Sequence, residues 1–295
     1  MKSNLQNHKT MIKVAILGYG NIGKAAEQAI QKAPDMELAG IYHHSDCLDD
    51  IQADVVLVCT PTREILHYAT LLLAKGISTV DSFDIHSEIY SHMQALKPIA
   101  MQHGAVSIVS AGWDPGTDSL IRTIMLAMTP DGQTYTNFGP GRSMGHTVAA
   151  KAIQGVRDAV SITIPIGEGK HQRDVYIQLE EGEDLQTVQQ RIVNDDYFAH
   201  DPINVIKVDS VLPYDTHNHG VLIQRQGIAS NISNQQLSFA MTINNPALTA
   251  QIMVSCARAA IRMKASKQYG AFTTIHIPPI YFLPLDEEQA IRTLV

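Results

Sequence analysis

The sequence is poor in residue types that mark several classes of protein. Its 295 residues include only three cysteines and one tryptophan, and charged residues make up 17%. The cysteines, Cys47, Cys59 and Cys256, are odd in number and far apart. They give neither a disulfide framework nor a zinc-binding spacing, so a reducing, cytoplasmic location is expected.

Charge and hydropathy disfavour two kinds of partner. Acidic residues outnumber basic ones by 29 to 22, which gives a net charge of −7. Nucleic acids and anionic membranes attract basic surfaces, so neither is expected as a partner. No apolar run approaches the roughly 18 residues of a membrane span. The polar residues 1–10 lack the apolar core of a signal peptide, and we expect them to be frayed.

Alternating strand and helix patterns predict the first of about two domains. Apolar runs typical of buried strands cover residues 12–17, 36–42, 54–60, 77–82 and 105–110. Helical spacing of apolar residues covers residues 21–33, 63–76 and 88–103, the last with a break or kink expected at Pro98. Such repeated units form a doubly wound parallel sheet, so we expect a Rossmann-type α/β domain over residues 11–116.

The pattern changes after Gly116. Apolar and polar residues alternate over 236–243, as in an antiparallel sheet with one wet face. A short helix is predicted over 184–193, and a long one over 244–264 with Asn245 as its N-cap. We therefore expect an α+β domain over residues 117–295, whose C-terminal segment either completes that domain or packs back on the first.

The segment GYGNIG contains a G-x-G-x-x-G pattern, formed by Gly18, Gly20 and Gly23, between a predicted strand and a predicted helix. In dinucleotide sites these glycines allow a tight turn, close approach of the pyrophosphate, and packing of helix on strand. The helix N-terminus then presents free N–H groups to the phosphates. A dinucleotide site is predicted here, and a glycine-rich turn without a ligand is the alternative.

The end of the second predicted strand bears on the type of dinucleotide. NAD-specific proteins usually place an acid about 20 residues past the glycine motif, to bind the ribose 2′-hydroxyl. This chain has His43, His44 and Ser45 there, and Asp46 lies further on. Because a carboxylate would repel a 2′-phosphate, its absence favours NADP, with NAD as the alternative. The histidines can donate to a phosphate or can be solvated loop residues.

Two carboxylates follow neighbouring strands, Asp84 after the fourth and Asp114 after the fifth. Ligands of open α/β sheets bind outside the carboxyl ends of the strands. A pair of carboxylates there suits an ammonium substrate and can accept its proton. The alternatives are a helix N-cap for the segment from His86, and a turn aspartate before Pro115. Trp113 lies beside this turn, where a ligand wall is favoured over ordinary core.

Seven segments resemble the meso-diaminopimelate dehydrogenase family. In chain order they are GYGNIG, VDSFDIH, SAGWDPG, FGPGRSMGH, AIQGVRDAVSITIP, HNHG and INNPALTAQ. The similarity spans nearly the whole chain from Met11. The short spacing between ITIP and HQRDVYI resembles a compact branch of the family, which acts on a wider range of D-amino acids and 2-oxo acids.

The resemblance implies a reaction. It is the reversible, NADP-dependent oxidative deamination of the D-centre of meso-2,6-diaminopimelate to L-2-amino-6-oxopimelate and ammonia, a reaction of lysine biosynthesis. It also implies a cytoplasmic homodimer with a dinucleotide-binding domain and a substrate-binding and dimerisation domain. Two alternatives remain: another amino acid dehydrogenase of the same architecture, such as a broad D-amino acid dehydrogenase, and a non-catalytic NADP(H)-binding sensor.

The resemblance also implies roles for individual residues. Asp84 and Asp114 are the candidate catalytic residues, and which of them is the base stays open. The residues implied to bind the substrate are Trp113, Phe138, Met144, Gly145, Thr163, Arg173, His219 and Asn245. The residues implied to bind the cofactor are Gly18, Tyr19, Gly20, Asn21, Ile22, Gly23, His43, His44, Ser45, Thr60, Pro61, Thr62, Ser82, Phe83, Pro115 and Gly116.

The chemistry of several of these residues adds expectations about the substrate pocket. Arg173 can grip a carboxylate bidentately, although a solvated strand-end arginine is the alternative. The longer-chain branch often carries tryptophan where Phe138 stands and glutamine where Met144 stands, so a broader pocket is expected. His217 and His219 form an H-x-H pattern, but no third ligand is marked and hydride chemistry needs no metal, so no metal is expected.

Overall fold

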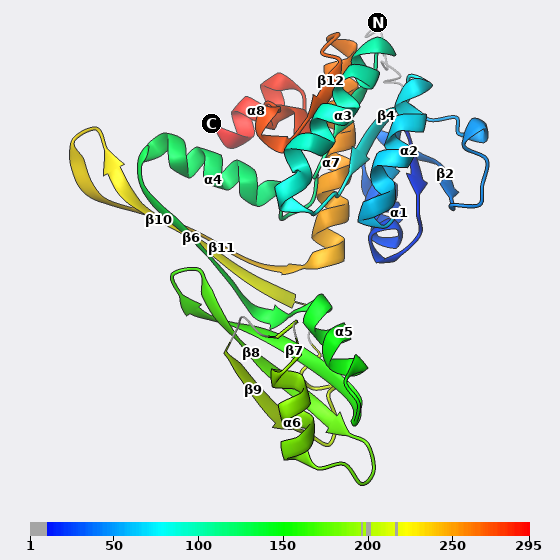
Figure 1. The fold of residues 1–295 in the computed structure, drawn as a ribbon. Coiled ribbons are helices and arrows are strands. Elements are labelled where there is room, and N and C mark those ends of the chain that lie inside the picture. The colour runs from blue at the N-terminus through cyan, green and yellow to red at the C-terminus, as the bar shows by residue number, and fades with distance from the viewer. Residues whose placement is uncertain (1–10, 196, 199–201, 216–217) are drawn as a thin grey trace, which may run out of the picture. The chain divides into compact units, whose positions relative to one another are not determined.

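The computed structural model describes residues 11–195, 197–198, 202–215 and 218–295 (Figure 1). Residues 1–10, for which a frayed terminus is expected, lie outside these ranges. The chain forms two compact units: Met1–Ile121 with Pro246–Val295, and Arg122–Asn245. Within the described ranges, no helix has the length and apolar character needed to cross a membrane.

Six parallel strands form the sheet of the first unit, in the order β12-β5-β4-β3-β1-β2. They are β1 (Ile12–Leu17), β2 (Met36–Tyr42), β3 (Val55–Val58), β4 (Ser78–Asp81), β5 (Val106–Ile108) and β12 (Gly270–Phe272). Because β2 and β3 lie on opposite sides of β1, the strand order reverses there. The predicted doubly wound parallel sheet is confirmed, and such a reversal is where open α/β sheets bind ligands.

Helices cover both faces of this sheet. Val14 and Ile16 of β1 face one core, which includes apolar residues of α1 (Asn21–Lys32) and α7 (Asn245–Ala265). Ala15 and Leu17 face the opposite side, where they pack with residues of α2 (Thr62–Ala74). The strands are therefore buried on both faces, which is why they are apolar along their whole length.

The first unit takes in more of the chain than the pattern change at Gly116 suggests. The predicted boundary assigns residues 117–295 to a second domain, with the alternative that the C-terminal segment packs back on the first domain. Residues 117–121 and 246–295 lie in the first compact unit, in line with that alternative. The reason is tertiary: β12 extends the parallel sheet beside β5, and α7 covers one of its faces. Two short 3₁₀ turns (Thr274–His276 and Pro279–Phe282) and α8 (Glu287–Leu294) follow β12.

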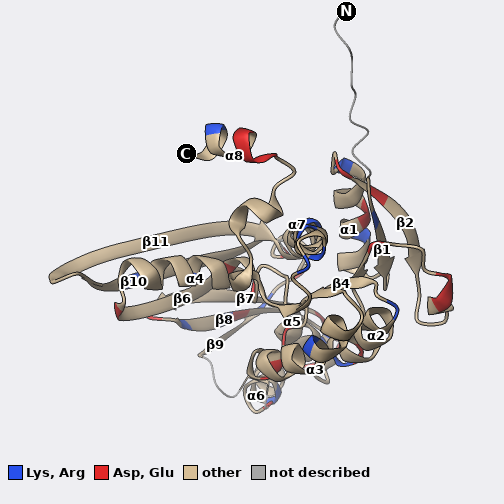
Figure 2. Ribbon diagram, turned by 90° about the horizontal axis from the view of Figure 1, so that it is seen from above, with Lys and Arg blue, Asp and Glu red and all other residues tan. Residues whose placement is uncertain are grey.

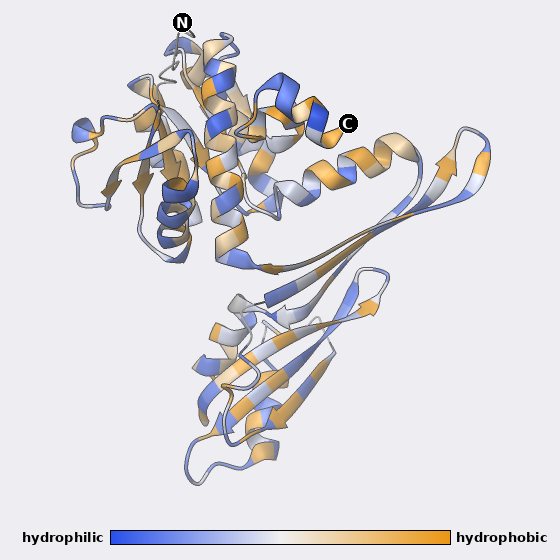
Figure 3. Ribbon diagram, turned by 180° about the vertical axis from the view of Figure 1, so that it is seen from behind, coloured by the Kyte–Doolittle hydropathy of each residue, from blue (hydrophilic) through white to orange (hydrophobic). Residues whose placement is uncertain are grey.

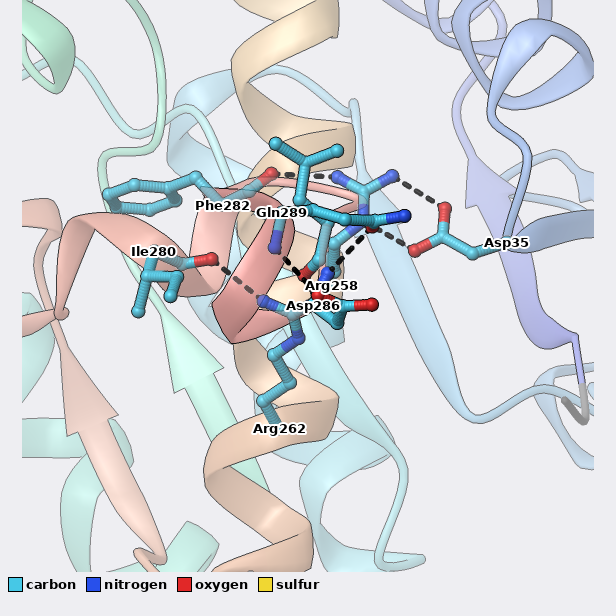
Figure 4. A network of polar contacts seen from close by, with 8 residues as sticks. Asp35, Arg258, Arg262, Ile280, Phe282, Asp286 and Gln289 are labelled. Carbon is cyan, nitrogen blue, oxygen red and sulfur yellow. Dashed lines mark hydrogen bonds and ion pairs between the residues drawn. The ribbon is translucent and has the colours of Figure 1, made fainter. Parts of the chain in front are cut away.

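A buried ion pair ties this C-terminal part to the start of β2 (Figure 4). Arg258 of α7 donates to both carboxylate oxygens of Asp35, at 2.6 and 2.7 Å, and to the carbonyl of Phe282 at 2.8 Å. One turn further along α7, Arg262 donates to the carbonyl of Ile280 at 2.7 Å. Bidentate, charge-assisted bonds of this kind fix geometry as well as adding energy.

The helix α3 (Ile89–Gln102) corrects one part of the prediction at Pro98, the expected break. The helix runs through Pro98 without a break. Pro98 lies on the exposed side of the helix, and the carbonyl that loses its donor belongs to Gln94, which is exposed as well, so water can satisfy it. Leu96 and Ala100 hold the helix against the core on either side of the proline.

The second unit is built on a mixed sheet in the order β11-β10-β6-β7-β8-β9, in which only β8 and β9 pair in parallel. The strands are β6 (Asp131–Arg142), β7 (Val156–Gly167), β8 (Lys170–Leu179), β9 (Ile203–Lys207), β10 (Asn218–Ala229) and β11 (Ile232–Asn244). Hydrophobic and hydrophilic residues alternate along these strands (Figure 3). The predicted α+β character and the antiparallel pairing of residues 236–243 are confirmed.

Two helices cover part of this second sheet. Residues of α5 (Met144–Ala152) and α6 (Leu185–Val193) share a core with Val175 and Ile177 of β8. The helix α6 matches its predicted range closely, whereas the residue pattern did not reveal α5 or α4 (Thr117–Met128). The strand β11 carries no charged residue (Figure 2).

Candidate functional site

The glycine loop between β1 and α1 has the backbone geometry of a close-packed turn. Gly18 has a φ of +95°, and a Cβ atom there would lie 2.7 Å from the carbonyl oxygen of Cys59. A Cβ on Gly23 would lie 2.2 Å from the Gly18 carbonyl oxygen. In contrast, a Cβ on Gly20 would meet nothing within 4 Å. Gly18 and Gly23 are therefore required by the fold itself, whereas the space beside Gly20 is open to a ligand.

The first turn of α1 also suits an anion. Gly20 is the N-cap of the helix and no side chain caps it. Free N–H groups at a helix N-terminus favour phosphate, and the helix dipole adds to this preference. Asn21 and Ile22 open the helix, and Tyr19 in the loop donates to Glu27 at 2.5 Å. The loop thus fits the diphosphate of a dinucleotide by its own geometry.

The loop after β2 holds His43, His44 and Ser45 in exposed positions. The carboxylate of Asp46 accepts a hydrogen bond from the backbone N–H of His43 at 2.7 Å, so it is engaged within its own loop. The ring of His43 lies 6.4 Å from that of Tyr19, edge to face. The ring contact places His43 beside the glycine loop.

The loop after β3 adds polar groups at the same edge of the sheet. Thr60 follows the strand, and its Oγ1 is buried without a hydrogen-bond partner in the described part of the chain. Buried polar atoms of native proteins are nearly always paired, so an unpaired hydroxyl calls for a ligand or water. Thr62 begins α2 just after Pro61, and its hydroxyl donates to Asp84 Oδ1 at 2.6 Å.

The loops after β4 and β5 bring the two candidate catalytic carboxylates to one edge. Asp84 is exposed, and the N-cap alternative for it is wrong, because Ile85 precedes the 3₁₀ turn His86–Glu88. Asp114 lies 3.8 Å from His86 Nε2, which is too long for a hydrogen bond. Its Oδ1 is buried and has no hydrogen-bond partner within the described residues. A buried carboxylate oxygen without a donor is available to an ammonium group.

The turn that carries Asp114 is closed by its own backbone. Gly112 N–H donates to the Pro115 carbonyl at 3.0 Å, and a Cβ on Gly116 would lie 1.9 Å from the Gly112 carbonyl oxygen. The Gly116 carbonyl accepts from the Thr274 hydroxyl at 2.8 Å. Trp113 is 6% exposed, so most of its surface packs within the protein. The turn is therefore a rigid platform for Asp114.

In the second unit, strand register assembles a row of polar residues that are far apart in sequence. His219 of β10 pairs with Gly141 of β6, Gly141 with Thr163 of β7, and Thr163 with Arg173 of β8. Arg173 Nη1 donates to the Thr163 hydroxyl at 2.6 Å. Arg173 is only 8% exposed, so the alternative of a solvated arginine is wrong.

His171 belongs to this row and was not selected from the sequence. Its Nε2 lies 2.9 Å from Arg173 Nη2. Since a guanidinium can only donate, His171 accepts through Nε2, which fixes its neutral tautomer. The signal was available, because residues two apart on a strand point to the same face.

His219 and Phe138 border the same row. Their rings meet edge to face, with centroids 6.3 Å apart. Burial, with the charge of Arg173 as a further cause, lowers the pKa of His219. His219 is thus neutral beside the cationic Arg173. It can donate or accept a hydrogen bond without competing with Arg173 for a carboxylate.

The remaining candidates lie near the ends of helices. Met144 and Gly145 begin α5, and a Cβ on Gly145 would lie 2.4 Å from the Tyr197 hydroxyl. The Met144 side chain is outside the described part of the structure, as is His217. Asn245 is the first residue of α7, one position later than the N-cap assignment has it. Ser82 and Phe83 lie between β4 and Asp84.

Comparison with known proteins identifies relatives over the whole chain. Residues 112–169 match the family model "Diaminopimelic acid dehydrogenase C-terminal domain". A meso-diaminopimelate D-dehydrogenase of Bacteroides fragilis is 47% identical, covering 96% of this chain and 99% of the relative.

Two solved structures are similar as well. A diaminopimelate dehydrogenase of C. glutamicum in complex with DAP aligns with a TM-score of 0.80 at 31% identity, covering 97% of this chain and 100% of the other. An engineered D-amino acid dehydrogenase bound to NADP+ aligns with a TM-score of 0.75 at 30% identity, with the same coverage. The similarity therefore extends across both compact units.

Proposed function

Because the chain belongs to the meso-diaminopimelate D-dehydrogenase family, we propose that it oxidises the D-configured amine carbon of meso-2,6-diaminopimelate with NADP+. The products are L-2-amino-6-oxopimelate, ammonia and NADPH, and the reverse direction is a reductive amination. The observation that carries this proposal is the buried Oδ1 of Asp114 in the loop after β5, which accepts no hydrogen bond within the described residues. An oxygen in this setting is suited to bind and deprotonate an ammonium group.

The glycine loop and the two loops after β2 and β3 are proposed to hold the dinucleotide. The open space beside Gly20 and the uncapped start of α1 suit the pyrophosphate. The unpaired hydroxyl of Thr60 offers a further hydrogen bond. When bound, the nicotinamide ring supplies the acceptor for the hydride that leaves the substrate carbon.

NADP is proposed over NAD on the basis of the loop after β2. The carboxylate of Asp46 is engaged with the backbone of His43, and no acid stands directly at the strand end. The exposed rings of His43 and His44 can donate to a 2′-phosphate. The engineered relative with bound NADP+ supports the same choice.

The chain's own residues then divide the work on the substrate. Asp114 and Asp84 hold the reacting ammonium group, and one of them accepts its proton as the amine becomes an imine. Water adds to the imine carbon, and ammonia leaves. Arg173, steadied by Thr163, is proposed to bind the distal carboxylate, for which a guanidinium has matching geometry.

A wider substrate range is proposed as well, with reductive amination of simple 2-oxo acids to D-amino acids. Phe138 supplies an apolar wall without an indole N–H, and Met144 cannot offer the hydrogen bonds of a glutamine amide. Two similar structures of an engineered D-amino acid dehydrogenase, at TM-scores of 0.75 and 0.86, support this breadth.

A homodimer in the cytoplasm is the proposed assembly. The helix α4 exposes Ile124 and Met128, which lie one turn apart on the same face of the helix, at 46% and 50% of their surface. Clustered exposed apolar side chains mark interfaces. Light scattering of the purified protein would then give twice the mass of one chain, and a monomer at micromolar concentration would contradict the proposal.

One set of initial rates tests substrate and cofactor together. NADP+ and NAD+ are each combined with meso-diaminopimelate, with its LL isomer and with D-alanine, and cofactor reduction is followed by absorbance. We expect the fastest reduction with NADP+ and the meso isomer. No reduction with the meso isomer, or equal rates for the meso and LL isomers, would contradict the proposed activity, and faster reduction with NAD+ would contradict the cofactor.

A further inference from the structure

The last residue of β4, Asp81, carries a fully buried carboxylate that none of the roles proposed so far uses. Its Oδ1 accepts hydrogen bonds from two backbone N–H groups, those of Phe83 and Ser110, each at 3.0 Å. Its own carbonyl oxygen accepts a third, from the N–H of Ala111 at 2.7 Å. Asp81 therefore binds the loop after β4 and the loop after β5 at the same time.

Both loops lead directly to a candidate catalytic carboxylate. Phe83 immediately precedes Asp84, and Ser110 and Ala111 lie just before the turn that holds Asp114. The spacing between the two carboxylates thus depends on how these loops are joined.

The backbone at Ser110 explains why such a joint is needed. Ser110 has a φ of +56°, in the left-handed region that side chains other than glycine rarely adopt. A residue in this region persists only where the surroundings hold it. The bond from its N–H to Asp81 is such a restraint, so its loss would let the loop relax and would shift Asp114.

The second carboxylate oxygen of Asp81 is held by a residue of the helix α3. His92 of α3 places Nε2 3.3 Å from Asp81 Oδ2, and both side chains are buried. The His92 ring also stacks on Phe83, with centroids 4.2 Å apart and planes 8° from parallel. His92 therefore restrains both the carboxylate and the residue before Asp84.

A buried carboxylate is not needed merely to hold this sheet together. Two residues before Asp81, β4 is joined to β5 by the neutral pair Thr79 and Ser107. Their hydroxyls are 3.0 Å apart, and both residues are fully buried. Buried charge is costly unless it is fully hydrogen-bonded, and apolar replacements are often as stable. The carboxylate of Asp81 instead lies where the loops after β4 and β5 are joined.

We propose that Asp81, supported by His92, is a positioning residue that sets the relative placement of Asp84 and Asp114 by holding the N–H groups of Phe83 and Ser110. The effect of Asp81 on catalysis rests on the proposed dehydrogenase function. Its hydrogen bonds to the two loops do not depend on that function. Displacing a catalytic group by about 1 Å can cost about 100-fold in rate.

The test compares Asp81→Ala, Asp81→Asn and the matched control Ser107→Ala in the full-length protein. Asp81→Ala should lower kcat about 100-fold, with KM for meso-diaminopimelate and for NADP+ changed less than about threefold. Asp81→Asn keeps an oxygen for both N–H groups and should recover most of kcat. Ser107→Ala removes a buried hydrogen bond from the same strands and should keep kcat within about twofold. A kcat for Asp81→Ala within threefold of the unaltered protein, or equal losses in Ser107→Ala, would overturn the proposal.

Hydrogen exchange of individual amides supplies a readout that does not need turnover. In Asp81→Ala the amides of Phe83 and Ser110 should exchange at least about tenfold faster, while those of Val80 and Ile108 in the strands stay protected. Unchanged exchange at Phe83 and Ser110, or equally faster exchange along β4 and β5, would contradict the proposal that Asp81 holds the two loops together. If the unaltered protein fails to oxidise meso-diaminopimelate, the proposed function fails, and the exchange result still decides the role of Asp81.

Discussion

The substitution Arg173→Met tests the division of labour in the proposed site most sharply. Methionine replaces the aliphatic part of the arginine side chain, so packing in the sheet is largely preserved. It removes the guanidinium that donates to Thr163 at 2.6 Å and approaches His171 Nε2 at 2.9 Å. If Arg173 binds the distal carboxylate, the variant loses that interaction for diaminopimelate and loses nothing for D-alanine, which has no such group.

The size of the effect follows from the burial of Arg173. Hydrogen bonds to charged groups contribute about 1.5–3 kcal/mol each, and Arg173 is 8% exposed, so water screens its charge little. A loss of about 3 kcal/mol corresponds to roughly 150-fold in kcat/KM. We expect a loss of this order for meso-diaminopimelate and less than about threefold for D-alanine.

The assay is steady-state kinetics with both substrates, together with a control arginine in the same unit. Arg191→Met breaks an ion pair with Glu183 at 3.1 Å, in which both side chains are about one-third exposed or less. It should leave kcat/KM for both substrates unchanged. Equal losses for diaminopimelate and D-alanine in Arg173→Met would refute the reasoning, since they would mean that Arg173 acts on something both substrates share.

Three further outcomes are expected. Asp114→Ala should lower kcat for meso-diaminopimelate by at least about 100-fold, and a near-normal kcat would rule it out as the base or as a partner of the ammonium group. Arg258→Met breaks a buried pair and should cost about 3–5 kcal/mol, or roughly 10 °C in Tm by calorimetry, while the exposed Arg292→Met should leave Tm unchanged. A thiol reagent at neutral pH should modify only Cys47 in the native protein, because Cys47 is exposed and burial raises the pKa of Cys59 to about 12. Rapid modification of Cys59 would contradict this expectation.

The doubly wound sheet could be predicted because its signals are local. Each strand before residue 110 is an apolar run with a turn or helix signal beside it, and the predicted ranges overlap β1 to β5. The strand β12 could not be found in this way. Its three residues gain strand geometry only by pairing with β5, which lies far away in the sequence. The same reasoning applies to α7, whose place in the first unit follows from the sheet face that it covers.

The candidate site divides along similar lines. The glycine loop and the aspartates after β4 and β5 are placed by local pattern, since every parallel strand ends at the same edge. The row of His219, Thr163 and Arg173 depends instead on the register of four strands, which the chain order alone does not specify.

The sequence by itself determined the strand–helix alternation, the glycine turn and the two aspartates, because each depends on a few neighbouring residues. Tertiary structure alone decided which residues surround them. It brought Asp81 against the N–H of Ser110, His171 against Arg173, and the C-terminal strand against β5. The physical reason is that hydrogen bonds and burial act between atoms close in space, whereas residue patterns report only on neighbours along the chain.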